Sequence, residues 1–243
     1  MTTCYHPEKR LLYVHIPKCA GTTLGGNWDE RAGEWHDSWL NDVLPGWSRK
    51  GLPNGHQPVR TMEHWTTQPV DFWARIIVTI RNPYAQQVSQ YRFWRARALA
   101  NAKMRKPYHD DDRFAASMAF HEFVQDPRSN GPNAVCGSHW KDAGGVYRWW
   151  CLDREGKIPQ NLRIVKVEDL QKGMEQALDG LGAAFKPMEV RNSFTDSDWR
   201  TWYTRGSARA VRDKFSWSLA NYYPELTGFV GSDLIHDMAT AKQ

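Results

Sequence analysis

The segment His15–Thr23 (HIPKCAGTT) brings a lysine, a glycine and two threonine hydroxyls together in one short turn. It follows the apolar run Leu11–His15 (LLYVH), which we predict to be a buried strand, and it leads into a predicted helix start. Main-chain N–H groups at the start of a helix bind anions, and the helix dipole favours negative charge there. Lys18 would add a point charge, and Thr22 and Thr23 would add hydroxyl donors. The segment therefore predicts a phosphate or sulfate site, and an ordinary strand-to-helix turn is the alternative.

A second candidate for anion binding is the segment Thr79–Tyr91 (TIRNPYAQQVSQY). Arg81 follows the apolar run Arg75–Ile80 (RIIVTI), the clearest buried strand in the chain. Ser89 comes eight residues after Arg81, in the second turn of the helix predicted to follow. A guanidinium grips phosphate through two hydrogen bonds, and a serine hydroxyl adds a donor. The alternative is an arginine that caps its own sheet edge and a serine on the surface.

The order of residues in the first segment differs from that of the loop that binds nucleoside triphosphates. That loop, GxxxxGK[ST], has its lysine after the last glycine. Here Lys18 precedes Gly21 by three residues. This difference argues against a standard ATPase or kinase.

In combination, the two segments resemble the sulfotransferase family that uses 3′-phosphoadenosine 5′-phosphosulfate (PAPS). The chain is most similar to the carbohydrate branch, which includes the heparan sulfate uronosyl (2-O) and glucosaminyl (6-O) sulfotransferases. In that family a PK-x-x-GTT loop follows the first strand, and an R-x-P…S element keeps eight residues from arginine to serine, as Arg81 and Ser89 do. The resemblance covers most of residues 11–230. Weaker matches follow in order at Phe120–Val124, Lys166–Leu170, Asn192 and Asn221–Leu226.

The resemblance implies transfer of the sulfuryl group from PAPS to an acceptor hydroxyl, with release of adenosine 3′,5′-bisphosphate (PAP). The acceptor oxygen would attack sulfur in line, so positioning and electrostatic stabilisation would supply most of the catalysis. Lys18 would neutralise charge on the leaving oxygen, and Arg81 and Ser89 would hold the 3′-phosphate. The 5′-phosphosulfate would be bound by Lys18, Cys19, Ala20, Gly21, Thr22 and Thr23. The expected acceptor is a hydroxyl-bearing carbohydrate or other small molecule; no metal and no nucleic acid partner are expected.

A general base must take the proton of the acceptor hydroxyl, and a histidine with a pKa near neutrality suits that task. In the heparan-type relatives a Gly-His pair lies between the two phosphate segments, well before the arginine. Gly55–His56 matches that position, so the resemblance implies His56 as the base. The alternatives follow in order: His64 and Glu63, then His36 or Glu34. We expect a structural role for His15, because it ends a strand.

The four cysteines, Cys4, Cys19, Cys136 and Cys151, are scattered and form no CxxC pair. A disulfide framework or a zinc site needs closer, patterned spacing, so we expect reduced thiols. Cys19 lies beside a lysine at a predicted helix N-terminus, which would favour a thiolate. We expect such a thiolate to be a side effect of the turn, without a part in the reaction.

Strands and helices alternate along the chain in the pattern of a parallel sheet covered by helices on both faces. We predict strands over 11–15, 75–80 and 162–167, and helices over 83–102, 112–124, 168–181, 196–203 and 207–222. The fold class is therefore α/β, and the resemblance implies a three-layer P-loop-like fold with a central parallel β-sheet flanked by helices. Both phosphate segments follow strands, where ligands bind in such sheets. We expect one sulfotransferase domain over 1–243, with a loop-rich insertion at about 26–71 that contains short helices.

Local signals define two of these helices more closely. Asn82 can cap the helix over 83–102, and Pro83 suits its first position. Gly182 is expected to end the helix over 168–181. In the first of the two helices, the apolar positions with helical spacing are Tyr84, Val88, Tyr91, Trp94 and Leu99, which we predict to face the core.

The chain has 243 residues, of which 41% are hydrophobic and 24% charged, so it can bury a sizeable core and long disorder is excluded. Its formal net charge of +5 favours anionic ligands. No Asp or Glu occurs from Phe72 to His109, where the basic residues are Arg75, Arg81, Arg92, Arg95, Arg97, Lys103, Arg105 and Lys106. This stretch is either a solvated helix face or a surface that attracts phosphate, sulfate or an acidic polymer. The 13 tryptophans are expected mainly in the core.

Two rival functions remain: a P-loop-type kinase, and a non-catalytic module that binds glycans or nucleic acid through the basic stretch and the tryptophans. The longest apolar run, near Ile76–Ile80, is far shorter than the ~20 residues of a membrane-spanning helix. The first residues, MTTCYHPEKR, lack the apolar core of a secretory signal. We therefore expect a cytoplasmic enzyme of bacterial or viral origin; the sequence indicates no oligomeric state.

Overall fold

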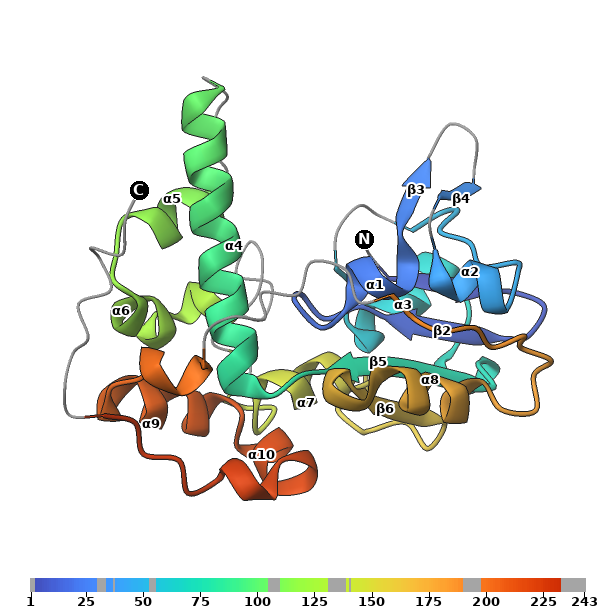
Figure 1. Cartoon of the computed structure of the whole chain (residues 1–243). Helices are drawn as coiled ribbons and strands as arrows, with labels where there is room; N and C mark the ends of the chain where they lie inside the picture. Colours follow the sequence, from blue (N-terminus) through green and yellow to red (C-terminus); the bar gives the residue numbers. More distant parts are fainter. Residues whose placement is uncertain are drawn as a thin grey trace. The chain divides into compact units, whose positions relative to one another are not determined.

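The computed structural model divides the chain into two compact units (Figure 1). The first unit consists of residues 1–81 and 150–193, and the second of residues 82–149 and 194–243. The structure describes residues 3–29, 34–36, 38–52, 56–104, 110–130, 139, 141–189 and 198–232.

The first unit is built on a four-stranded sheet with the order β1-β2-β5-β6. Its strands are β1 (Cys4–His6), β2 (Leu11–Val14), β5 (Arg75–Ile80) and β6 (Leu162–Lys166). β2, β5 and β6 run parallel, and β1 pairs antiparallel with β2. The three predicted strands are confirmed, and the mostly parallel sheet flanked by helices confirms the α/β class. β1 is missing from the prediction because three residues carry no periodic signal.

Burial of the strands follows their place in the sheet. All of β2 is buried, and so is β5 apart from Arg75. β6 is an edge strand of the sheet, and Val165 is its only buried residue. An edge strand is flanked by a single neighbour, and less of its surface is covered.

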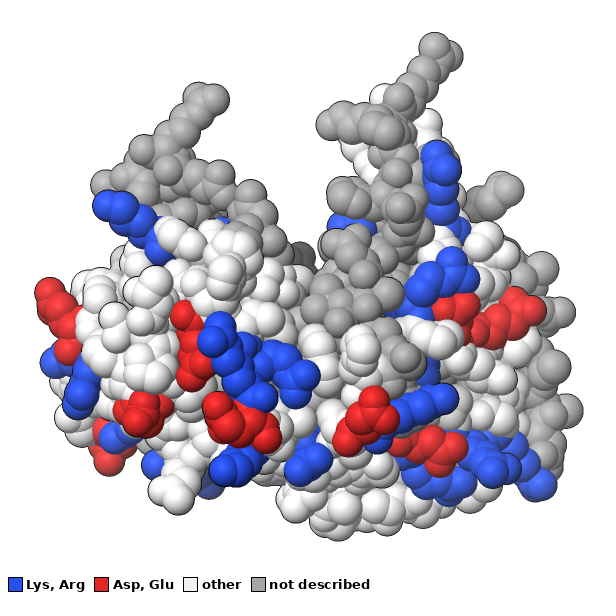
Figure 2. Space-filling view, turned by 180° about the vertical axis from the view of Figure 1, so that it is seen from behind, with Lys and Arg blue, Asp and Glu red and all other residues white. Residues whose placement is uncertain are grey.

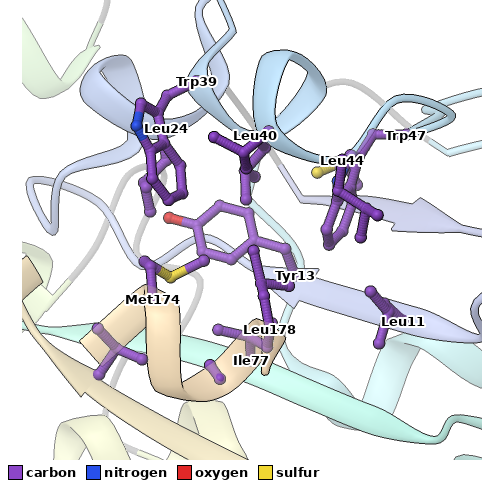
Figure 3. Packing of buried hydrophobic residues seen from close by; sticks show 14 of the residues in the cluster. Leu11, Tyr13, Leu24, Trp39, Leu40, Leu44, Trp47, Ile77, Met174 and Leu178 are labelled. Carbon is purple, nitrogen blue, oxygen red and sulfur yellow. The ribbon is translucent and has the colours of Figure 1, made fainter. Parts of the chain in front are cut away.

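One face of this sheet carries a hydrophobic cluster that forms part of the core of the first unit (Figure 3). Figure 3 shows the Tyr13 ring in the middle of the cluster, with Trp39 and Leu40 on one side and Met174 on the other. The described part of this unit contains the α-helices α1 (Gly21–Gly25), α2 (Trp39–Val43), α3 (Val59–Thr66) and α8 (Leu170–Leu178). Packing against α2 and α8 therefore holds strand β2 in place, and the turn that follows β2 begins at a rigid element.

The insertion at about 26–71 holds more regular structure than expected. The predicted short helices are present as α2, α3 and the 3₁₀ turn η1 (Val70–Phe72). It also contains an unpredicted antiparallel pair of strands, β3 (Asn27–Asp29) and β4 (Glu34–His36). These strands are three residues long, which is too short for an alternation signal.

The longest helix of the second unit is α4 (Pro83–Lys103), which confirms the predicted helix. The Asn82 side chain accepts hydrogen bonds from the N–H groups of Tyr84 and Ala85, as a helix cap does. The prediction that Leu99 faces the core is wrong, because 64% of its surface is exposed. Ala98 is buried in its place, since it lies four residues after Trp94 on the same helix face.

Several predicted helices are shorter or interrupted. The predicted helix over 112–124 is wrong as a single element, because α5 (Asp110–Ala116) and α6 (Phe120–Gln125) are separated at Ser117–Ala119. The Ser117 hydroxyl donates to the Phe114 oxygen, a local bond that competes with helix continuation. The predicted helix over 207–222 is likewise two helices, α9 (Arg205–Lys214) and α10 (Ser216–Tyr222).

Two further helix boundaries differ from the prediction. The helix expected over 168–181 begins as a 3₁₀ turn, η4 (Val167–Asp169), and ends at Leu178, before Gly182. Gly180 already has a φ of 72°, which ends helical geometry earlier. In the region 196–203 the described residues form a 3₁₀ turn, η5 (Trp199–Trp202). The remaining short elements are α7 (Val146–Cys151), η2 (Pro127–Asn130) and η6 (Pro224–Leu226).

The expected use of tryptophan in the core is confirmed for most of those described. Trp39, Trp47, Trp73, Trp94, Trp149 and Trp150 are all buried. Trp199, Trp202 and Trp217 are only partly buried, and Trp65 is exposed over 39% of its surface. Cys4, Cys19 and Cys151 are buried thiols without a disulfide, while Cys136 lies outside the described residues.

Candidate active site

The predicted anion-binding turn folds as a tight backbone loop between β2 and α1. The Cys19 N–H donates to the Ile16 oxygen at 3.1 Å, which closes the turn. Lys18 and Ala20 have left-handed backbones, with φ values of 65° and 63°. That region costs a non-glycine residue roughly 1–2 kcal/mol. The turn is therefore strained at two positions that the rest of the structure must hold in place.

Two buried hydroxyls connect this turn to the sheet. Thr79, in β5, places its Oγ1 atom 2.7 Å from the main-chain oxygen of Cys19. The Tyr13 hydroxyl, from β2, lies 3.0 Å from the same Oγ1 atom. Both side chains are fully buried, and so is Cys19. A thiol enclosed in this way is shielded from reagents in solution.

The start of α1 packs directly against the His15 ring. A Cβ atom added to Gly21 would lie 2.0 Å from Cε1 and Nε2 of His15, so the site accepts only glycine without a shift. The His15 ring is buried and stacks on Tyr13 at an interplanar angle of 13°. His15 therefore fills the space between the sheet and the turn.

His56 is held against the beginning of the same turn. Its Nδ1 atom lies 3.0 Å from the His15 main-chain oxygen, and the two rings approach to 4.5 Å between centroids. A carbonyl oxygen only accepts, so Nδ1 donates, and in the neutral ring Nε2 carries the lone pair. The pKa of His56 is lowered to about 4, mainly by burial; the positive charges of Lys18 and Arg49 act in the same direction, and the hydrogen bond to His15 acts against them. His56 is therefore a neutral imidazole at pH 7. Its basic nitrogen is Nε2, which is not the atom that bonds to the His15 oxygen.

The alternative bases fall into two groups. Glu63 has both oxygens engaged, one accepting from the Val70 N–H at 3.0 Å and the other paired with Arg154 at 3.1 Å. His64 is exposed and rests edge-on against Trp65, with 4.7 Å between ring centroids. The side chains of Glu34 and His36, like Asn192, lie outside the described residues.

The strand register brings the basic segments to one edge of the sheet. Val14 pairs with Val78, and Ile80 with Lys166, in parallel strands. The segments that follow β2, β5 and β6 therefore all leave the sheet on the side where the carboxyl ends of these strands lie. Lys18 and Arg81 both belong to these segments, and each is partly exposed. Ligands of open parallel sheets bind at this edge.

Ser89 belongs to the second unit and is described with it. It lies in α4 and is only 4% exposed, so the alternative of a surface serine is wrong. Arg81 is the last residue of the first segment of the first unit, and α4 begins two residues later. The spacing between Arg81 and Ser89 is therefore a property of the sequence.

Comparison with known protein families decides the class of this chain. The profile described as "Sulfotransferase family" matches residues 1–215. The chain belongs to the sulfotransferase family. Members of this family move a sulfuryl group from a donor, generally PAPS, to an acceptor. A search of curated proteins and a search of solved structures return no match to this chain.

One cation near the candidate base of this sulfotransferase is absent from the sequence predictions. Arg49 is 8% exposed, and its charge acts on both His56 and Cys4. It lies in the insertion, where no motif marks it. Arg49 precedes His56 by seven residues, and the family resemblance assigns no role to that position.

Some arginines of the basic stretch of the sulfotransferase contact aromatic side chains of the same helix, α4. Arg95 donates to the Tyr91 hydroxyl at 2.9 Å, and Arg97 lies 5.2 Å from the centre of the Phe93 ring. Figure 2 shows basic and acidic side chains interspersed on the face it displays. These contacts favour the interpretation of this stretch as a solvated helix face.

Across the described residues of the sulfotransferase, His, Cys, Asp and Glu form no group of three that would suit a metal ion. None of the helices there combines the length and the apolar character that crossing a bilayer requires.

Proposed function

We propose that residues 1–243 act as one sulfotransferase domain that takes its sulfuryl group from PAPS and transfers it to the hydroxyl of an acceptor, releasing PAP. The observation that carries the proposal is that the glycine turn, Lys18 and His56 lie together beyond the carboxyl end of β2. Arg81 follows the carboxyl end of the neighbouring parallel strand, β5. This end of the sheet offers N–H donors, cations and a neutral base for a multiply charged donor.

The residues of the turn fit the 5′-phosphosulfate end of the donor. The Cys19 N–H already donates within the turn, so the amides from Ala20 to Thr23 are the ones proposed to bind phosphate. Lys18 is proposed to neutralise the leaving phosphate oxygen, and Arg81 the 3′-phosphate. Ser89 is proposed as a second ligand of the 3′-phosphate on the family resemblance alone.

The transfer itself needs one proton movement. Nε2 of His56 removes the proton of the acceptor hydroxyl, and that oxygen forms the new bond to sulfur as the bond from sulfur to the 5′-phosphate oxygen breaks. Lys18 stabilises the negative charge that the leaving oxygen gains. A pKa of about 4 leaves His56 a weak base in the empty protein, and a bound anion beside it would raise that pKa toward neutrality.

The acceptor is proposed to be a carbohydrate or another small hydroxyl compound. This part of the proposal depends on the resemblance to the carbohydrate branch of the family. It is tested with labelled PAPS and a panel of neutral and acidic oligosaccharides beside phenols and simple alcohols. Transfer to phenols alone would contradict a carbohydrate acceptor while leaving the donor unaffected.

Thermal unfolding tests the donor class directly. PAP at about 100 times its dissociation constant should stabilise the protein by roughly 2.7 kcal/mol, a rise in midpoint of roughly 5–10 °C. Adenosine 5′-monophosphate and ATP with Mg²⁺ serve as comparisons, and neither should match PAP. A rise with ATP and Mg²⁺ alone would favour the kinase, and no rise with any nucleotide, together with salt-dependent polymer binding, would favour the binding module.

A further inference from the structure

A chain of buried hydrogen bonds runs from β2 through β5 to the anion-binding turn. The Cys19 oxygen is a carbonyl and can only accept, so the Thr79 hydroxyl donates to it across 2.7 Å. Because that donation uses the only proton of Thr79, the Tyr13 hydroxyl at 3.0 Å must donate to Thr79 Oγ1. Burial raises the pKa of Tyr13 well above its usual value, which keeps its phenol protonated. The direction of both bonds is therefore determined.

This chain also determines where one amide of the turn points. The C=O of one residue and the N–H of the next lie in the same planar trans peptide and point in opposite directions. The Cys19 carbonyl is directed into the buried sheet at Thr79, and Cys19 itself is fully buried. The N–H of Ala20 is consequently directed away from the sheet, and Ala20 is partly exposed.

The hydrogen bond also holds a strained piece of backbone. The left-handed residues Lys18 and Ala20 flank Cys19 on both sides. Such conformations persist only where the surroundings over-determine them. The Thr79 bond joins residues 60 positions apart, so it fixes the turn to the sheet independently of the local contacts of the turn.

We propose that Thr79 is a positioning residue of this sulfotransferase: its hydroxyl aims the Ala20 N–H at the 5′-phosphate of the donor. The inference rests on the proposed function, since it assumes that the turn holds that phosphate. Thr79 touches neither donor nor acceptor. It acts through the orientation of a single peptide.

A role in positioning differs measurably from a role in stability alone. Loss of stability lowers the affinity for every ligand alike, or for none. Loss of the Ala20 orientation affects only ligands that carry a 5′-phosphate. Adenosine 3′-monophosphate lacks that group and shares the rest of PAP, so the ratio of the two dissociation constants isolates the effect.

The variants are Thr79→Val, which keeps the shape and removes the hydroxyl, and Thr79→Ser, which keeps the hydroxyl. Tyr13→Phe is the matched control, because it removes one bond of the chain and leaves Thr79 able to donate to Cys19. Calorimetry measures PAP and adenosine 3′-monophosphate binding, and urea unfolding measures stability. If Thr79→Val does not fold, Thr79→Cys replaces it, since a thiol fills similar space and is a weaker donor.

Thr79→Val should weaken PAP binding by about tenfold and leave adenosine 3′-monophosphate binding within about twofold. Thr79→Ser should keep the wild-type ratio of the two dissociation constants. Tyr13→Phe should lower the stability of the protein and leave that ratio unchanged. An unchanged ratio in Thr79→Val, or an equal loss for both ligands, would overturn the inference. Failure of the wild-type protein to bind PAP would overturn the proposed function instead, before any variant is compared.

Discussion

Nδ1 of His56 lies 3.0 Å from the main-chain oxygen of His15, so a histidine of the insertion is oriented by the residue at which the anion-binding turn begins. The contact joins residues 41 positions apart and fixes the tautomer of His56. It leaves Nε2 as the nitrogen that accepts a proton. The candidate base and the candidate phosphate turn therefore share one anchor.

The first prediction concerns His56 as the base. His56→Gln should lower kcat by roughly 100- to 10,000-fold, the range for loss of a general base, because no side chain then takes the acceptor proton. The affinity for PAP, measured by calorimetry, should stay within about twofold of wild type. His64→Gln is the matched control and should keep nearly full activity, since His64 lies exposed on α3. The reverse pattern, with the loss in His64→Gln, would move the base to His64.

The second prediction concerns stability and pH. The pKa of His56 is about 4 in the folded protein, below the ordinary value of 6.5 that applies to the unfolded chain, so between these values the unfolded chain binds more protons. Stability should therefore rise with pH across this window, lie lowest below about pH 4 and level off above 6.5. The contribution of His56 is on the order of 3 kcal/mol. The pKa of His6 is also lowered by burial, so the wild-type slope alone does not isolate His56.

The measurement for this second prediction is the difference in urea unfolding free energy between wild type and His56→Gln. Gln does not titrate, so this difference should change with pH in favour of the wild type as the pH rises from about 4 to 6.5. A difference that stays constant across the window would show that His56 titrates alike in the folded and unfolded chains.

The parts of the fold that sequence reasoning predicts are those with strong local signals. The runs Leu11–Val14 and Arg75–Ile80 are nearly all apolar, so their burial could be predicted from residue type. Asn82 and Pro83 mark the start of α4 for a similar reason. Boundaries such as the break at Ser117–Ala119 depend on single side-chain hydrogen bonds that compete with the helix, and residue type alone does not decide that competition.

The candidate site divides in the same way. Lys18 and Arg81 could be found because each lies within a short motif at the end of an apolar run. His56 could be named only through the spacing of a family, and its hydrogen bond to His15 follows from the fold. Arg49 and Thr79 belong to no motif: Arg49 acts on His56, seven residues later, and Thr79 acts on Cys19, 60 positions away in sequence.

The third prediction separates the charge of Lys18 from its backbone. Lys18→Ala should lower kcat by roughly 100- to 1,000-fold, the cost of removing one group that stabilises developing charge. Lys18→Gly should lose the same activity and gain about 1 kcal/mol of stability, because glycine adopts the left-handed φ of 65° without strain. Both quantities come from steady-state kinetics and urea unfolding. If Lys18→Ala keeps wild-type turnover, Lys18 has no part in leaving-group stabilisation.

The fourth prediction tests the packing of α1 on His15. Gly21→Ala would normally favour a helix by up to about 1 kcal/mol, but its Cβ would lie 2.0 Å from the His15 ring. That ring is buried against Tyr13 and His56, so it cannot move aside freely. Gly21→Ala should therefore lose about 1–3 kcal/mol of stability, as overpacked sites do. Gly228→Ala is the control, because a Cβ there meets no atom within 4 Å, and its stability should change by less than about 0.5 kcal/mol.

A second substitution shows whether the His15 ring is the cause of that loss. His15→Ala removes the ring that the new methyl group would strike. The double variant Gly21→Ala with His15→Ala should therefore be more stable than the sum of the two single changes predicts, with a coupling of about 0.5–3 kcal/mol. Additive losses would mean that Gly21 is required for the backbone of the turn itself. In that case the close approach of the His15 ring would follow from the turn, and the ring would not determine which residue occupies position 21.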